Sequence, residues 1–300
     1  MHETGWLWAV FTLIAAAGQT ARNAMQRELT TTLGTVGATH VRFLFGFPFA
    51  LLFLAGVMLV TGLDLPRPAL SYWPWIILGA GAQILATALM LAAMGERSFV
   101  VTIAYIKTEP VQVALFGLIF LGDRLSLPMV AAILIATSGV IVMSLKAGVA
   151  NGSIRPTLLG LAAGAMFALS AIGYRGAILN LGLSNFVMAA TFTLAVGLVM
   201  QAGLLTLYLL AREPKVMRDI MAAWRPSLFA GFMGAAASQF WFLAFAIATA
   251  ASVRTLALVE VLFAQFITHI VFRQPTSRRE LVGIVLVVTG VGLLVWTAGR

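Results

Sequence analysis

The chain has 300 residues, of which 61% are apolar and only 10% are charged. Soluble domains average about 45–50% apolar and about 25% charged residues, and a soluble fold of this length cannot hide so much hydrocarbon from water. The composition therefore excludes a soluble enzyme and a nucleic-acid-binding protein, although the formal charge is +9. Because the chain has no Cys, disulfides, thiolate metal sites and a Cys nucleophile are excluded too. An all-α integral membrane protein is predicted.

Apolar stretches long enough to cross a bilayer divide the whole chain. A hydrocarbon core of about 30 Å needs about 20 helical residues per crossing, and polar, Pro- or Gly-containing breaks separate ten such stretches. We expect the first to be retained, because no Lys or Arg precedes it as in a signal peptide. The ten predicted helices are Trp6–Ala24, Ala38–Thr61, Trp73–Met94, Phe99–Leu121, Leu127–Leu145, Thr157–Leu179, Asn185–Leu210, Leu228–Ile247, Ser252–Phe272 and Leu281–Ala298.

The second half of the chain repeats the pattern of the first. An offset of 151 residues aligns Glu109 with Glu260, Ser126 with Ser277, and Gly139-Val140 with Gly290-Val291. Each half holds five predicted helices, an odd number, so the second half enters the membrane inverted. We therefore predict ten transmembrane helices as two inverted five-helix repeats, residues 1–150 and 151–300. The alternative is a chance correspondence among Leu- and Ala-rich helices.

The last two helices of each half carry matching motifs. The first half reads Glu109-Pro110-Val111, Gly122-Asp123-Arg124 and Gly139-Val140, and the second reads Glu260-Val261-Leu262, Arg273-Gln274-Pro275 and Gly290-Val291. With its ten helices, the chain resembles the EamA-type branch of the drug/metabolite transporter superfamily over essentially its whole length. Its overall similarity is greatest to the YddG-type exporters of aromatic and other amino acids. In two places it departs from the family pattern: Asp123 replaces the usual Glu, and the second turn lacks both Gly and acid.

This resemblance implies a secondary transporter that exports small metabolites, most of all aromatic or neutral amino acids, by alternating access through a central midplane cavity. It implies no enzyme activity, no cofactor, a monomer in a bacterial-type inner membrane, and cytoplasmic termini. The Lys and Arg residues, however, concentrate in the loops after odd-numbered helices, and this distribution by itself predicts that both termini lie outside. The sequence has no P-loop for ATP and no metal-binding motif.

Polar residues inside the predicted helices are the candidate substrate-binding residues. Such groups are costly in lipid, so they usually face a cavity or a partner. Amides and hydroxyls suit a zwitterionic or neutral polar ligand, while aromatic rings can stack on a planar group or hold an ammonium. The alternative is simple hydrogen bonding between helices. The candidates are Gln19, Asn23, Gln83, Thr87, Tyr105, Glu109, Ser170, Tyr174, Gln239, Trp241 and Glu260.

The charged residues inside the helices have separate interpretations. Glu109 and Glu260 occupy equivalent positions in the two halves and are candidates for proton coupling, because burial disfavours a charged carboxyl; a structural ion pair is the alternative. Lys107 lies about 200° around the helix from Glu109, so the two need not pair. Arg42 is expected to snorkel toward headgroups, and His40 to be a hydrogen-bonded neighbour.

Other functions predict other residues. A multidrug carrier would need more unpaired acids, and a sugar-phosphate or nucleotide-sugar carrier would need several inward Lys or Arg, for which only Lys107 and Arg254 are available. An intramembrane lipid enzyme would need a nucleophile beside a base, which the sequence does not group together. The inverted repeat argues against a channel.

Overall fold

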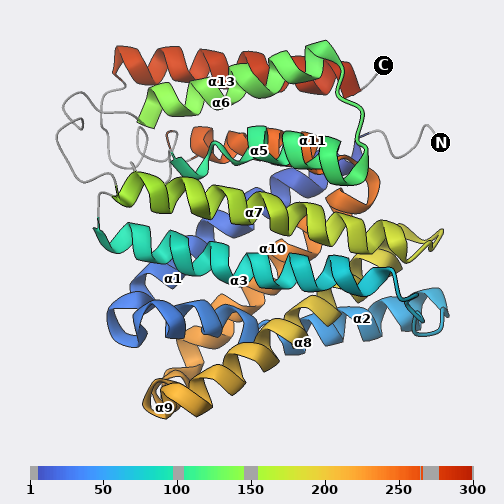
Figure 1. The fold of residues 1–300 in the computed structure, drawn as a ribbon, viewed down its shortest axis with the longest axis vertical. Helices are drawn as coiled ribbons and strands as arrows, with labels where there is room; N and C mark the ends of the chain where they lie inside the picture. Colours follow the sequence, from blue (N-terminus) through green and yellow to red (C-terminus); the bar gives the residue numbers. More distant parts are fainter. Residues whose placement is uncertain (1–5, 97–104, 145–154, 264, 266–276, 299–300) are drawn as a thin grey trace.

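The computed structural model describes residues 6–96, 105–144, 155–263, 265 and 277–298, with the backbone alone at 21, 23–28, 94–96, 144, 156 and 226. Every regular element within these ranges is a helix, and Figure 1 shows their arrangement. The elements are α1 Leu7–Leu44, α2 Phe47–Thr61, α3 Tyr72–Glu96, α5 Glu109–Phe116, η1 Gly117–Leu121 (π-helical), α6 Leu127–Ser144, α7 Arg155–Asn180, α8 Phe186–Arg212, α9 Pro214–Ala222, α10 Trp224–Ile247, α11 Ala250–Leu256, η2 Ala257–Val259 (3₁₀) and α13 Arg278–Ala298.

Six helical stretches of the described chain are long and apolar enough to cross a membrane. They are Leu29–Thr61, Tyr72–Ala93, Thr157–Asn180, Phe186–Arg212, Ser227–Ile247 and Arg278–Ala298. Three shorter apolar helices, Leu7–Thr20, Glu109–Leu121 and Leu127–Met143, accompany them. The prediction of an all-helical protein with several membrane-crossing segments is therefore confirmed, while the count of ten crossings stays a prediction.

The first helix is longer than predicted. Its expected end at Ala24 is wrong, because α1 continues without a loop to Leu44. The only non-helical backbone inside it is at Gly34, with φ 67° and ψ 179°, a conformation that glycine adopts without steric cost. The chain thus turns at Gly34, and the second membrane-crossing stretch begins at Leu29, nine residues earlier than Ala38.

The most extensive helix contacts join the two halves of the chain. Helix α3 packs along α7, α1 along α10, and α6 along α13; in Figure 1, α3 and α7 run side by side through the middle of the molecule and α6 and α13 form its upper edge. The offset of 151 residues relates the first two contacts, since it carries α1 onto α7 and α3 onto α10. Each half therefore packs mainly against the other.

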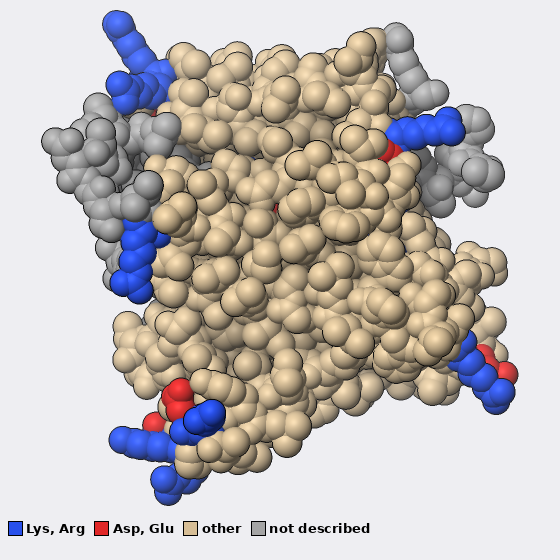
Figure 2. Space-filling model, in the orientation of Figure 1, with Lys and Arg blue, Asp and Glu red and all other residues tan. Residues whose placement is uncertain are grey.

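Charged side chains gather at two opposite rims of the molecule. On the face drawn in Figure 2, Lys and Arg lie at these rims and almost no charge lies between them. Many large apolar side chains of the protein are strongly exposed, for example Leu59 at 85% and Val60 at 88%. Exposing so many apolar side chains to water would be unfavourable, whereas lipid chains can cover them.

Candidate functional site

The site is built on two short helices that meet at the centre. Helix α5 begins at Glu109 directly after a turn at Lys107 and Thr108, and the 3₁₀ segment η2 directly precedes Glu260. These two interruptions lie at equivalent positions in the two halves. Helix α5 packs against α11, which leads into η2. Breaks of this kind inside a membrane expose backbone polar groups, and they are tolerated where they line a cavity or protein.

Two ion pairs connect the halves across this contact. The Oε1 atom of Glu109 lies 3.0 Å from Nε of Arg254, and Lys107 pairs with Glu260. All four side chains are almost fully buried. The acid of each half thus pairs with a base of the other half, and the prediction that Lys107 need not pair with Glu109 is confirmed.

Aromatic rings cover one side of this cluster. The guanidinium carbon of Arg254 lies 4.5 Å from the ring centre of Trp241 and 5.4 Å from that of Phe245. Cation–π attraction strengthens when the cation is desolvated, as it is here. From the sequence we predicted that the Trp241 ring contacts a ligand. In the structure the guanidinium of Arg254 lies against this ring.

Two small cavities lie beside the ion pairs. The first, of about 30 Å³, is lined by Gln19, Arg22, Met90, Ile106, Lys107, Glu109, Phe167, Arg254 and Glu260. The second, of about 10 Å³, is lined by Gln19, Arg42, Gln83, Phe167, Tyr174, Ser238, Trp241, Phe242, Phe245 and Arg254. A water needs about 10–15 Å³ of such space, so neither cavity admits more than a water or two. We call the two together the central cavities; they share Gln19, Phe167 and Arg254.

Polar side chains behind the second cavity bond to one another. The Tyr174 hydroxyl donates to Oε1 of Gln83 at 2.9 Å, and Nε2 of Gln201 donates to the same oxygen at 2.9 Å and to the Ala80 carbonyl at 3.0 Å. Gln201 was missed by the sequence analysis, although a lone Gln in the otherwise apolar α8 is a signal that could have found it. This network fixes the position of Gln83 at the cavity wall.

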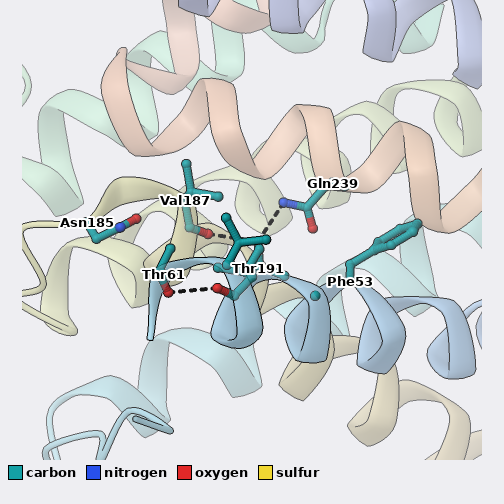
Figure 3. A pocket seen from close by; sticks show the side chains of 9 residues that line it. Phe53, Thr61, Asn185, Val187, Thr191 and Gln239 are labelled. Atoms are coloured by element: carbon teal, nitrogen blue, oxygen red, sulfur yellow. Dashed lines mark hydrogen bonds between the residues drawn. The ribbon is translucent and has the colours of Figure 1, made fainter. Parts of the chain in front are cut away.

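A larger pocket of about 510 Å³ lies between α2, α8 and α10. Figure 3 shows Gln239 pointing toward Thr191 in its wall, and Nε2 of Gln239 donates to Oγ1 of Thr191 at 2.7 Å. The rest of the wall is largely apolar and includes Phe53 and Val60. Gln239 therefore faces a different space from its sequence neighbours Ser238 and Trp241, which line the central cavities.

The predicted site residues other than Gln239 divide into three groups. The central cavities collect Gln19, Gln83, Glu109, Tyr174, Trp241 and Glu260, and Thr87 contacts the cavity residue Arg42. Tyr105 and Ser170 do not line either central cavity. The side chain of Asn23 lies outside the described residues.

Arg42 is placed differently from the prediction. Arg42 does not snorkel: it is 3% exposed, and its Nη1 and Nη2 donate to Thr87 Oγ1 at 3.4 Å and Ser238 Oγ at 3.5 Å. Arg42 lies eight residues after the turn at Gly34, about 12 Å along the helix at 1.5 Å per residue. Arg22, near the end of the first predicted helix, lies within α1 and is only 2% exposed. The Nε2 atom of His40 lies 3.0 Å from Oγ1 of Thr206, so His40 is hydrogen-bonded to a neighbouring side chain, as predicted.

Arg175 joins α7 to Asp123, which follows η1, and to the end of α10. Nη2 of Arg175 lies 3.7 Å from Oδ1 of Asp123, and its Nη1 donates to the carbonyls of Phe245 and Ala248. The last carbonyls of a helix have no partner within it, so Arg175 satisfies those at the end of α10. Arg175 lies in α7, within the predicted helix Thr157–Leu179, and is partly buried.

Arg175→Leu is therefore expected to lower the free energy of unfolding by about 2 kcal/mol, since hydrogen bonds to charged groups contribute about 1.5–3 kcal/mol. Thermal unfolding of the detergent-solubilised protein measures the change. Arg124→Leu, which removes the exposed neighbour of Asp123, is the matched control and should unfold like the parent. Equal stability of the two variants would contradict a structural role for Arg175.

Comparison with known proteins identifies a shared fold. No family profile matches the chain, and no curated protein sequence is significantly similar to it. Chains of known structure do match, 27 in number. One, described only as the crystal structure of a protein, aligns with 99% of this chain and 98% of its own length, with a TM-score of 0.73 and 17% sequence identity. The fold described here is therefore shared over its full length with a protein of experimentally determined structure.

Proposed function

We propose that this protein is a secondary transporter of small polar metabolites that moves its substrate through the central cavities by alternating access. The single observation that carries the proposal is the pair of buried ion pairs, Glu109 with Arg254 and Lys107 with Glu260. Each pair links the two halves of the chain within an otherwise apolar helical protein. Charges at bilayer depth are expensive and mark substrate or ion pathways in membrane proteins.

The arrangement of the helices also supports transport. Secondary transporters are commonly built from two inverted repeats, with broken helices surrounding a site near the middle of the membrane. The breaks before Glu109 and Glu260 and the exchange of helix contacts under the 151-residue offset fit that design. We propose on this basis ten membrane crossings in two inverted halves, 1–150 and 151–300.

The small size of the central cavities suggests how a transport cycle proceeds. The described conformation is closed, because neither cavity has room for a metabolite. Opening requires α5 and α11 to separate, which breaks the ion pairs and leaves buried charges without partners. A substrate that supplies charged groups of its own compensates them. Its binding thereby lowers the cost of opening the closed conformation.

Amino acids are the proposed substrates. The carboxylate of a zwitterion matches Arg254 and Lys107, and its ammonium matches Glu109 and Glu260. Either Glu can also exchange a proton once its partner has moved away, which would couple export to the proton gradient. The proposal includes a bacterial-type inner membrane and, from the family resemblance, cytoplasmic termini.

Uptake into proteoliposomes tests this function. Purified protein is reconstituted and a panel of labelled amino acids is offered with and without a pH gradient across the membrane. Saturable uptake that the gradient accelerates is expected. Uptake at the same rate with and without the pH gradient would contradict proton coupling through Glu109 and Glu260. The absence of uptake for every compound would refute amino-acid transport.

Gln19→Leu is expected to reduce transport at least about tenfold without loss of folded protein. Gln19 lines both central cavities, and a site that hydrogen-bonds its substrate loses about that much or more when one buried polar partner is removed. Initial uptake rates in proteoliposomes measure the effect. Asn180→Leu makes the same amide-to-leucine change where the amide bonds only the Gly176 carbonyl of its own helix, so its rate should equal that of the parent. Unchanged transport in Gln19→Leu would exclude Gln19 from the site.

A further inference from the structure

The central cavities contain more positive than negative charge. Among the described residues, four cationic side chains and only two acidic ones line them. The two acids already pair with Arg254 and Lys107. Arg42 alone, whatever Arg22 contacts, therefore leaves the central cavities with an excess positive charge.

The excess of positive charge is clearest in the second cavity. Its wall includes Arg42 and Arg254 and no acidic residue. Arg42 is 3% exposed, its contacts are the hydroxyls of Thr87 and Ser238 and the ring of Phe43, and no described carboxylate lies within ion-pair distance of it. Hydroxyl groups do not neutralise a guanidinium, and a buried charge without a counter-charge is unfavourable.

Two N–H donors in this wall have no hydrogen-bond acceptor among the described residues. The indole Nε1–H of Trp241 and the Nε–H of Arg42 are both buried and bond to no described residue.

We propose that the substrate of this transporter is a small organic anion with a net negative charge, and that its carboxylate or phosphate group binds Arg42, Arg254 and the Trp241 indole N–H. This inference rests on the proposed transport function and narrows its substrate class from amino acids in general to anionic compounds, acidic amino acids among them. Guanidinium groups bind carboxylates and phosphates by bidentate, charge-assisted hydrogen bonds. Neutral amino acids have no net charge and therefore do not compensate the positive charge of Arg42. We expect them to bind more weakly than anions.

Ligand-dependent thermal stability of the purified protein tests the inference, because a ligand that binds the folded state raises Tm. The probes are succinate, glycerol 3-phosphate and phenylalanine at about 10 mM, a concentration that detects weak binding, with sodium chloride at equal ionic strength as reference. We expect succinate or glycerol 3-phosphate to raise Tm and phenylalanine to do so less. A response to succinate alone assigns a carboxylate site, and a response to glycerol 3-phosphate alone assigns a phosphate site. An equal or larger response to phenylalanine would overturn the inference.

Two variants locate the site. Arg42→Gln should weaken anion binding at least about tenfold, the usual effect of removing one partner of a buried charge pair. Trp241→Phe keeps a ring against Arg254 but removes the indole donor, so it should weaken binding even if Arg42→Gln fails to fold. Arg67→Gln removes an exposed arginine and should bind like the parent. Anion responses that survive both Arg42→Gln and Trp241→Phe would place binding elsewhere.

Transport and ligand binding, measured together, distinguish failure of the anionic substrate from failure of the proposed transport function. If neutral amino acids are transported but the anions neither stabilise the protein nor compete for uptake, the transporter stands and the anionic substrate is wrong. If the anions stabilise the protein but no probe is transported, the site stands and transport is wrong.

Discussion

Arg254→Met is expected to lower the free energy of unfolding by about 3–5 kcal/mol, because it leaves Glu109 as a buried carboxylate without its counter-charge. The two side chains are each 9% exposed and 3.0 Å apart, so little water can compensate the loss. The change also removes the cation that lies over Trp241. Denaturant titration of the detergent-solubilised protein, followed by Trp fluorescence, measures it.

A double variant isolates the ion pair from other effects. Glu109→Gln combined with Arg254→Met removes both charges, and we expect it to recover much of the stability lost in Arg254→Met, since contacting residues are strongly non-additive. Transport should remain lost in both variants. Arg212→Met, at an exposed position, is the control and should be close to the parent. Additive effects of the two substitutions would contradict a direct pair.

Gly79→Val is expected to prevent assembly of the helix bundle. A Cβ at Gly79 would lie 3.0 Å from the backbone nitrogen of Tyr174, and one at Gly173 would lie 2.5 Å from the backbone nitrogen of Gly79. Backbone atoms cannot rotate aside, so α3 and α7 would have to separate along a contact that joins the two halves. Overpacking usually costs about 1–3 kcal/mol, and this contact should exceed that range. Size-exclusion chromatography of the solubilised protein reports the result.

Gly81→Val is the matched control for this change. It places the same side chain two residues along the same helix, where a Cβ would meet nothing within 4 Å. The variant should elute as a monodisperse peak like the parent, while Gly79→Val aggregates or fails to accumulate. Equal behaviour of the two would mean that close packing of α3 on α7 does not hold the halves together.

Hydropathy predicted an all-helical protein with several membrane-crossing segments because every crossing of a lipid bilayer has the same requirement. A run of about 20 apolar residues satisfies it, and such runs are visible without knowledge of the fold. The end of the first helix was missed because the polar stretch after Ala24 is equally compatible with a loop or a continued helix. The turn instead occurs at Gly34, where φ is 67°.

The site was only partly predictable for a different reason. Glu109 and Glu260 stood out because they recur at equivalent positions, and the structure does bring them together. Their partners are determined by contacts between the halves, which no local pattern encodes. The same holds for Arg42: in the sequence it lies near the predicted start of the second helix, and its burial comes from contacts with Thr87 in α3 and Ser238 in α10.

Access to the central cavities from both sides of the membrane tests the central claim most directly. The chain contains no Cys, so Ser238→Cys introduces a single thiol into the wall of the second cavity beside Arg42. A membrane-impermeant thiol reagent is applied from either side of oriented vesicles, with Ser71→Cys, an exposed position, as the control. Alternating access predicts that Ser238→Cys reacts from each side, at rates that a transported substrate changes, while Ser71→Cys reacts from one side only. Reaction of Ser238→Cys from neither side, or from a single side in every condition, would contradict the account.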